Sequence, residues 1–468
     1  MQTWDLIIVG ARCSGAALAA LLARRGLKVA LLEAAALGSD MPMSTHLVQP
    51  PGMDVLDRLG IGDRMRAAAP ATYRMCLGLD GVSAVAPLPE GRPAYCVRRS
   101  QLDPWLQQAA EQSGAVLFER HRVVELLRDE QRVVGVVART AQGPVELRAP
   151  LVVGADGPHS TVAACVGAPE YLVTEGTRAG YWSYYPAPES WTAPWDAIIE
   201  HQGDDIRYGF RCDGDLVLLL YMGPRDIVNG WGRDYRTKLE QAFQGSETTR
   251  ALCAGRTPVG KTIGLLKTRF FYRQAVGPGW ALAGDAGHFK DFVTGHGISD
   301  ALIGAEHLSQ AVLDGRPEAF EHYWRERDAR TLPLHFDAIR QGRVGQNTPF
   351  MRWIVSEARE RPELLARMAQ IFDRKLSPHE LVPPHTLLGI LAKAALRGRF
   401  DVLSGATSDG LAMVREAREI SRRHRLASQA AVRLARAPAA APVRAGSGGA
   451  SHTGPVQPMS SLDAAASR

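Results

Sequence analysis

Residues 5–15 of this chain, DLIIVGARCSG, decide its fold class. The apolar run Leu6–Val9 ends at a glycine, a pattern typical of a buried parallel strand. Residues Ser14–Arg25, rich in Ala and Leu, predict a helix that the next glycine terminates. A second apolar run, Lys28–Glu33, predicts the following strand. The chain therefore opens with a βαβ unit.

The turn between this strand and helix has the composition of a dinucleotide site. Gly10 permits a sharp turn, Gly15 lets the helix pack closely on the strand, and the helix N-terminus at Ser14 stabilises phosphate charge. Glu33, at the end of the second strand, can accept both hydroxyls of an adenosine ribose. Arg12 stands where the common fingerprint has its second glycine. Its guanidinium could reach a phosphate or a neighbouring loop, or it could point to solvent.

Two later segments each place an aspartate at the end of an apolar strand. They are LVVGADGPHS at 151–160 and GWALAGDAGH at 279–288, and the second continues to GHGI at 295–298. An aspartate at the carboxyl end of a parallel strand points into the ligand crevice. Each segment alone is also compatible with an ordinary connection from a strand into a loop. The first turn alone is likewise compatible with a βαβ unit that binds no dinucleotide. Their order and separation together favour a dinucleotide site.

The three segments resemble the dinucleotide, DG and GD motifs of the flavoprotein monooxygenases of the para-hydroxybenzoate hydroxylase fold. The resemblance covers roughly residues 3–315. It is strongest to a branch of FAD-dependent oxidoreductases that carries an arginine in the first glycine loop and STH followed by PPG, as at 44–46 and 50–52 here. It implies an α/β fold: a Rossmann-type FAD-binding domain with an inserted β-rich substrate domain and a helical C-terminal region.

The resemblance also implies a set of cofactor-binding residues. They are Gly10, Arg12, Ser14, Gly15, Glu33, Arg99, Asp156, Gly284, Asp285, Gly295, Gly297 and Ile298. The first glycine loop would hold the pyrophosphate of FAD, and Glu33 its adenosine ribose. Arg99 would reach the cofactor, Asp156 would support the side facing FAD and NAD(P)H, and Asp285 would bind the ribityl chain. The 295–298 loop would line the isoalloxazine ring with backbone amides.

Candidates for proton transfer follow the GD motif. His288, Lys290, Asp291 and His296 lie within a few positions of one another, so we expect them near the flavin. One of them could deprotonate a substrate or relay a proton. The alternative is a polar loop solvated at a domain boundary. Aromatic residues gather at 181–195, where they could wall a dry pocket or pack an ordinary sheet.

The pattern along the chain predicts five regions. We expect the first part of the FAD-binding domain at 1–170, a β-rich substrate domain at 171–277, the second part of the FAD-binding domain at 278–335, a helical region at 336–436 and a disordered tail at 437–468. The tail is predicted from its Ala, Pro, Gly and Ser composition.

Local signals predict several elements within these regions. A helix is expected over 98–113, and another from about 297 to 313. Three strand-like runs lie at 122–127, 132–138 and 145–148. The runs 206–211 and 216–221 flank an Asp-Gly pair, which indicates a hairpin.

Composition excludes several classes of protein. The 468 residues carry a formal net charge of +6, without the basic, aromatic-interleaved runs of a nucleic-acid-binding protein. The six cysteines form no C-x-x-C pair, which disfavours a metal site and a disulfide framework and fits a reducing cytoplasm. No secretory leader or membrane-spanning stretch is evident. The segments 387–396 and 415–436 suit core-packing helices, although peripheral membrane contact is the alternative.

The resemblance implies an FAD-dependent monooxygenase that uses NAD(P)H and O₂ to hydroxylate or epoxidise an aromatic or unsaturated small molecule. Only one dinucleotide fingerprint is present, as in hydroxylases that bind the nicotinamide transiently. The main alternative is a flavin-dependent reductase of the geranylgeranyl reductase type. A halogenase is disfavoured because its W-x-W-x-I-P signature is absent, and a flavin-binding redox sensor is a further alternative. The oligomeric state stays open.

Overall fold

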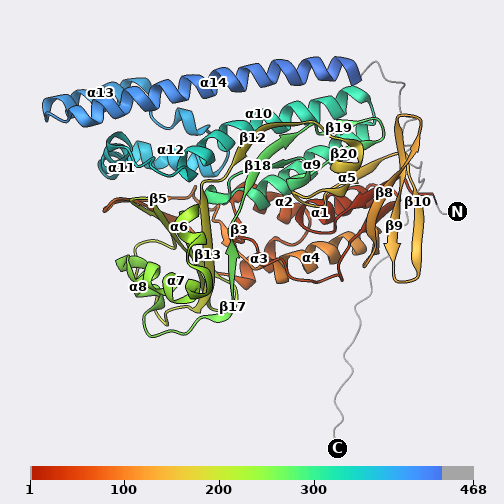
Figure 1. The fold of residues 1–468 in the computed structure, drawn as a ribbon, viewed down its shortest axis with the longest axis horizontal. Coiled ribbons are helices and arrows are strands. Elements are labelled where there is room, and N and C mark those ends of the chain that lie inside the picture. The colour runs from red at the N-terminus through yellow and green to blue at the C-terminus, as the bar shows by residue number, and fades with distance from the viewer. Residues whose placement is uncertain (1–2, 435–468) are drawn as a thin grey trace, which may run out of the picture.

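The computed structural model describes residues 3–434 of the chain (Figure 1). A six-stranded sheet lies at its centre, in the order β19-β20-β11-β1-β2-β7. Its strands are β1 (Leu6–Val9), β2 (Val29–Leu32), β7 (Val116–Phe118), β11 (Val152–Gly154), β19 (Val276–Gly277) and β20 (Trp280–Leu282). All neighbouring pairs are parallel except β19–β20. The predicted α/β fold, opening with a βαβ unit, is confirmed.

Three helices cover one face of this sheet. They are α1 (Cys13–Ala23), α4 (Arg99–Gln112) and α9 (Gly297–Asp314). Helix α1 is buried along nearly its whole length, since its Ala and Leu side chains share one core with α4, α9 and the central strands. The same side of the molecule carries α2 (Pro50–Arg58) and α3 (Gly62–Ala68) (Figure 1). The helices expected over 98–113 and 297–313 are confirmed.

A second, seven-stranded sheet has the order β17-β13-β16-β15-β14-β4-β5. Its strands are β4 (Arg74–Leu79), β5 (Val82–Pro87), β13 (Arg178–Pro186), β14 (Ala197–Gln202), β15 (Asp205–Cys212), β16 (Leu216–Pro224) and β17 (Val259–Leu265). The predicted hairpin is present, because β15 and β16 pair in antiparallel register with Cys212 opposite Leu216.

Two features of this region differ from the prediction. Strands β4 and β5 lie in the segment assigned to the FAD-binding part, but β4 pairs in parallel with β14 and so extends the substrate sheet. Three short helices also interrupt the region expected to be β-rich: α6 (Arg225–Asn229), α7 (Tyr235–Gln244) and α8 (Glu247–Cys253). Their sequences are polar, but Leu239 and Phe243 of α7 pack on the sheet, and tertiary contact decides their conformation.

Three smaller sheets complete the strand pairing. The predicted runs between 122 and 148 form an antiparallel sheet of β8 (Arg122–Asp129), β9 (Arg132–Thr140) and β10 (Gly143–Arg148). A second joins β12 (Glu170–Glu175), β18 (Arg269–Arg273) and β21 (His288–Phe289). The pair β3 (Leu47–Val48) and β6 (Tyr95–Cys96) packs between the two large sheets, because Leu47 and Cys96 belong to the core of the seven-stranded sheet and Val48 and Tyr95 to that of the six-stranded sheet. Helix α5 (Thr161–Val166) follows β11.

The C-terminal part is helical, as predicted. It comprises α10 (Pro317–Gly342), α11 (Pro349–Glu360), α12 (Pro362–Phe372), α13 (Pro384–Leu396) and α14 (Phe400–Leu434). Figure 1 shows α14 running along the outer edge of the molecule above α10, with α11 and α12 beneath it next to β5. Helix α13 turns Ile390 and Ala394 inward but leaves Leu388 and Leu396 exposed. Among the described residues, no helix has the length and apolar character needed to span a bilayer. The predicted tail, 437–468, lies outside the described residues.

Candidate active site

Two glycines of the first turn are required by the close approach of neighbouring segments. Gly10 has φ +102°, in the left-handed region, and a Cβ there would collide with the carbonyl oxygen of Ala155. A Cβ on Gly15 would collide with the carbonyl oxygen of Gly10. The loop after β11 therefore lies directly against the β1–α1 turn, and the carboxyl ends of the two parallel strands meet at one edge of the sheet, where the ligand crevice was predicted.

Glu33 borders the same crevice from the end of β2. Its carboxylate is buried and accepts two backbone N–H groups, those of Ala11 and Ala35, each at 3.0 Å. These bonds fix the side chain beside the glycine turn. A carboxylate has lone pairs for about four donors, so the oxygens retain capacity for ribose hydroxyls.

Arg12 is held by protein groups. Its guanidinium donates to Asp103 Oδ2 at 3.0 Å and to the backbone oxygen and side chain of Ser39, both at 3.2 Å. The other oxygen of Asp103 accepts from Arg99 Nε at 2.7 Å. Asp103 is fully buried, so it joins Arg12 to Arg99 through one carboxylate. Of the three predicted orientations, Arg12 takes the one toward a neighbouring loop, and the solvent-directed orientation is wrong.

The groups around the GD motif fit a ligand rich in hydroxyls and phosphates. Ser14 Oγ is buried and has no hydrogen-bond partner among residues 3–434. Burial raises the pKa of the partly buried Asp285 to about 6, although the positive charges of Arg99 and Lys290 oppose this. Its carboxylate accepts no hydrogen bond from the described part of the chain. A Cβ on Gly297, at the start of α9, would meet no atom within 4 Å. Unpartnered polar atoms and open space at a helix N-terminus are what FAD would use.

Asp156 is engaged in a local structural contact. One carboxylate oxygen accepts the backbone N–H of Thr161 at 2.7 Å and that of Val162 at 3.3 Å, which caps α5. The other oxygen is buried without a partner in the described residues. Burial raises the pKa of this side chain. Asp156 thus anchors the loop against the glycine turn, and its free oxygen is the part that remains for a ligand.

The loop after the GD motif is buried, so the solvated alternative is wrong. His288, Lys290, Asp291 and His296 are each 8% exposed or less. Lys290 forms an ion pair with Asp300 of α9. Burial lowers the pKa of Lys290, and it also lowers those of both histidines well below the ordinary value. The imidazoles are therefore neutral at pH 7.

The histidines differ in what they face. His296 borders the cavity described below, and its Nδ1 lies 3.1 Å from Thr294 Oγ1. His288 packs against the ring of Tyr272, with centroids 5.3 Å apart, and does not line that cavity. The Lys290–Asp300 pair is extended by Arg374, which donates to Asp300 at 3.1 Å. Of the four candidates for proton transfer, His296 alone lines the cavity.

Several residues of the site were not predicted from the sequence. His46, from the STH segment, is hydrogen-bonded to Tyr184 of β13. Burial and the charge of Arg99 lower the pKa of His46 to about 3. The segment lies against the 295–298 loop, which is the predicted flavin loop, because a Cβ on Gly295 would be 3.3 Å from Leu47 Cδ2. The STH motif was the available signal for His46, whereas nothing local to Asp103 or Arg374 indicated their roles.

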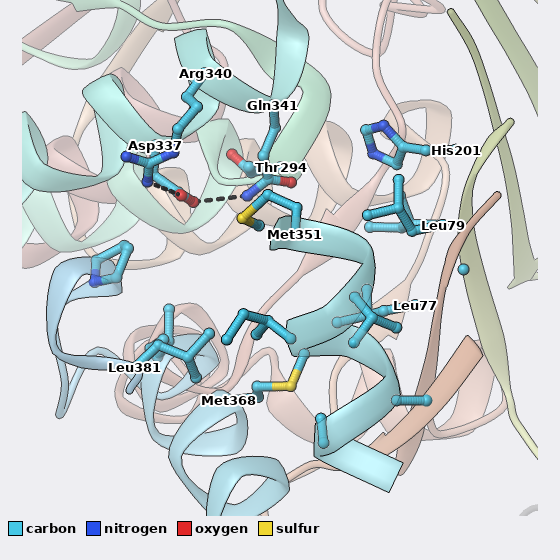
Figure 2. A pocket seen from close by; sticks show the side chains of 18 of the residues that line it. Leu77, Leu79, His201, Thr294, Asp337, Arg340, Gln341, Met351, Met368 and Leu381 are labelled. Atoms are coloured by element: carbon cyan, nitrogen blue, oxygen red, sulfur yellow. Dashed lines mark hydrogen bonds and ion pairs between the residues drawn. The ribbon is translucent and has the colours of Figure 1, made fainter. Parts of the chain in front are cut away.

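An apolar cavity of about 230 Å³ extends from the flavin loop between the seven-stranded sheet and the C-terminal helices (Figure 2). Thr294 and His296, on either side of Gly295, line its near end. Polar side chains of α10, Asp337, Arg340 and Gln341, border the same end (Figure 2). Most of the remaining lining residues come from β4, β14, α11 and α12. The large apolar ones among them are Leu77, Leu79, Ile199, Met351, Ile354, Val355, Leu364, Met368, Ile371 and Phe372.

The aromatic cluster at 181–195 packs within its own domain. The ring of Tyr181 stacks on Tyr235 at 5.0 Å, and Trp191 meets Trp195 edge-on at 5.4 Å. None of the cluster's members lines the cavity. Ordinary sheet packing therefore accounts for these residues, with Tyr184 as the exception because it contacts His46.

Comparisons with known proteins agree with this geometry. A family model described as FAD binding domain matches residues 3–200. The probable electron transfer flavoprotein-quinone oxidoreductase YgcN of Escherichia coli (strain K12) is 32% identical over 330 residues, 66% of this chain and 76% of that protein. Squalene epoxidase erg1 of Schizosaccharomyces pombe is 32% identical over 166 residues, 33% of this chain and 36% of its own length. Digeranylgeranylglycerophospholipid reductase 1 of Methanopyrus kandleri is 27% identical over 64% of this chain and 78% of that protein.

Solved structures share the fold at low identity. The flavin-dependent brominase Bmp2 superposes with a TM-score of 0.71 over 85% of this chain and all of its own, at 15% identity. The p-nitrophenol 4-monooxygenase PnpA of Pseudomonas putida DLL-E4 gives a TM-score of 0.68 over 81% of this chain and all of its own, at 18% identity.

Proposed function

Because this chain belongs to the FAD-dependent oxidoreductases of the para-hydroxybenzoate hydroxylase fold, we propose that it is a monooxygenase. It uses NADH or NADPH and O₂ to hydroxylate or epoxidise an aromatic or otherwise unsaturated small molecule. Oxygen transfer competes with release of peroxide into water, so the reaction requires a site that excludes solvent. The observation that carries the proposal is the apolar cavity that begins at Thr294 and His296, on either side of Gly295 in the predicted flavin loop.

The residues of the crevice are assigned to FAD as follows. Gly10, Gly15 and Ser14 would contact the pyrophosphate, Glu33 the adenosine ribose and Asp285 the ribityl chain. Arg99, fixed through Asp103, would reach the cofactor from α4. When bound, the flavin supplies hydride acceptance from the nicotinamide and the activation of O₂. The described residues hold no second dinucleotide fingerprint, which favours transient binding of NAD(P)H over a dedicated domain.

Proton transfer is assigned to His296. Its Nδ1 contacts Thr294, and its Nε2 makes no hydrogen bond to the described residues, so Nε2 is free to accept a proton from a substrate in the cavity. Burial keeps the imidazole neutral at pH 7, as a proton acceptor must be, and the same lowered pKa makes it a weak base that suits the relay of a proton. Lys290 and His288 lie behind this loop, where they would influence its charge.

A flavin-dependent reductase acting on a carbon–carbon double bond is the second candidate. The observation that favours it is the similarity to the digeranylgeranylglycerophospholipid reductase over 78% of that protein's length. Such a reductase would need the same FAD residues and the same apolar cavity, but would insert no oxygen.

The experiment is substrate-stimulated turnover of the purified holoenzyme. NADH or NADPH oxidation and O₂ uptake are recorded in parallel against a panel of phenols and unsaturated lipids, with catalase added to detect peroxide. We expect at least one compound to stimulate both rates equally, with little peroxide released. Stimulation that persists without O₂ would favour the reductase, and no turnover with either nicotinamide would favour a redox sensor.

A further inference from the structure

The cavity has a polar end and an apolar end. The polar end, at the flavin loop, contains Asp337, Arg340 and Gln341, spaced so that they share one face of α10 (Figure 2). Met368 and Leu381 lie at the opposite end (Figure 2). A ligand that fills this space must itself be amphipathic, with its polar group beside the flavin loop.

The apolar end is aliphatic and adaptable. Its side chains are leucine, isoleucine, valine and methionine, with Phe372 as the one aromatic ring among the described lining residues. Methionine is unbranched and polarisable, so Met351 and Met368 can follow a flexible chain. A wall of this kind suits an alkyl or isoprenoid chain better than a stack of fused aromatic rings, which gains from aromatic partners.

The charge at the polar end decides which head group is accepted. Arg340 is the one lysine or arginine among the described lining residues, and it is already bound to two carboxylates, Asp337 at 2.8 Å and Glu416 at 3.1 Å. A further carboxylate, Asp409, also borders the cavity. His201 adds no positive charge at pH 7, because burial lowers its pKa to about 4. An anionic head group would therefore meet excess negative charge.

The cations behind the flavin loop do not change this balance. Lys290 and Arg374 both pair with Asp300, and the charges of Arg99 and Lys290 oppose the burial that raises the pKa of Asp285. These cations are each matched by a buried carboxylate: Lys290 and Arg374 by Asp300, and Arg99 by Asp103. A neutral hydroxyl has partners at the polar end: the amide oxygen of Gln341 and Nε2 of His296 accept no hydrogen bond from the described residues.

We propose that the substrate is an uncharged amphipathic molecule: a neutral hydroxyl- or carbonyl-bearing unsaturated head joined to an alkyl or isoprenoid chain. This inference rests on the proposed function for the role of the cavity. It excludes carboxylate-bearing and phosphate-bearing substrates. The head lies at Gln341 and His296, and the chain runs toward Met368.

The test is equilibrium binding to the oxidised holoenzyme, followed by the change in flavin absorbance at pH 7.5 without NAD(P)H. The probes are phenol, 4-ethylphenol, 4-butylphenol, 4-hexylphenol and 4-hexylbenzoate. Each methylene moved from water into the cavity should strengthen binding about threefold to fourfold. The anionic 4-hexylbenzoate should bind at least about tenfold more weakly than 4-hexylphenol. The inference would be overturned if affinity did not change with chain length, or if 4-hexylbenzoate bound as tightly as 4-hexylphenol.

Substitutions at the two ends of the cavity test where the chain and the head group of the ligand bind. Met368→Trp fills the apolar end, so 4-hexylphenol should lose most of its advantage while phenol binds as before. Leu388→Trp, on the exposed face of α13, is the control and should match the wild type. Asp337→Asn removes one negative charge, so it should reduce the difference in affinity between 4-hexylphenol and 4-hexylbenzoate. Flavin content and Tm verify folding, and Met351→Trp replaces Met368→Trp if that variant is unstable. An unchanged chain-length series in a folded Met368→Trp protein would contradict the placement.

The outcomes separate this inference from the proposed function. The titrations need no turnover, so they can succeed in a protein that proves to be a reductase. Conversely, oxygen insertion into a short or anionic compound, with no chain-length effect on binding, would leave the monooxygenase assignment intact and reject the substrate class.

Discussion

Asp103 directs one oxygen toward Arg12 and the other toward Arg99, so the two arginines are positioned by one buried carboxylate. Breaking a hydrogen bond to a charged group costs about 1.5–3 kcal/mol. Arg12 also holds the backbone oxygen and side chain of Ser39, which makes it a positioning residue for the loop beside the glycine turn.

Arg12→Ala should weaken FAD affinity by about tenfold or more, since Arg99 and the Ser39 loop lose their orientation. Arg12→Lys should lose less, because an ammonium can keep one of the contacts. Arg25→Ala, at the exposed end of the same turn-and-helix segment, removes the same charge and serves as the control. The measurement is titration of FAD into apoprotein. Wild-type affinity in Arg12→Ala would show that the network does not support the cofactor.

We predict that the affinity for FAD depends on pH through the ionisation of Asp285. Its pKa is raised to about 6 without ligand, and donors from ribityl hydroxyls would favour the ionised form and lower it. Binding is therefore strongest when the carboxylate is already ionised, above pH 6, and is weakened as pH falls through 6. We expect about a tenfold loss of affinity from pH 8 to pH 5.

The control for this prediction is Asp285→Asn, which cannot ionise. It should bind FAD more weakly at pH 8 and show a flatter pH profile. If the variant keeps the wild-type slope, another group, such as Asp291 with its pKa raised to about 7 by burial, is responsible.

The sequence was sufficient for residues whose role depends on local geometry. Gly10, Gly15 and Glu33 meet at one crevice as predicted, because strand ends and tight turns are encoded within a few positions. Asp103 and Arg374 were not identifiable in this way. Asp103 is four positions from Arg99 but 91 from Arg12, and Arg374 is 74 positions from Asp300, so only the folded structure brings the full network together.

At the level of elements, the β1–α1 turn carries the most stringent requirement. A Cβ on Gly15 would overlap the carbonyl oxygen of Gly10, and backbone on both sides prevents relief. Gly15→Ala should therefore yield protein with no retained flavin and a lowered Tm. Gly389→Ala is the matched control, because its Cβ meets nothing within 4 Å on helix α13. It should retain flavin and gain about 0.5–1 kcal/mol of stability. Equal flavin content in the two variants would contradict the assigned turn.

Periodicity identified the elements that are long or strongly apolar. The helices α4 and α9 and the β15–β16 hairpin lie close to their predicted bounds. Helix α8 was missed although Ser246 caps it, because its seven residues are too few to show a helical period. Strand β4 was placed in the wrong sheet, since pairing with β14 is a long-range choice that no local pattern encodes.

For the whole molecule, the cavity illustrates what sequence reasoning could not supply. Its wall combines β4, β14, the flavin loop and the helices α10, α11 and α12, which are far apart in the chain. The C-terminal helices were predicted as helices, but their packing against the substrate sheet depends on tertiary contacts. The molecule thus holds an apolar, partly open cavity next to the predicted flavin ring, and oxygen transfer is a reaction that benefits from an apolar site.

The most direct test of this account is the mass of the product formed under ¹⁸O₂. Purified holoenzyme is supplied with NADPH or NADH and with the compound that most stimulates nicotinamide oxidation. A monooxygenase places one atom of ¹⁸O in the product and the other in water, so we predict a product that is heavier than the substrate by one ¹⁸O atom. A product that gains two hydrogens and no ¹⁸O, or peroxide as the only product of O₂ with every compound tested, would contradict the account.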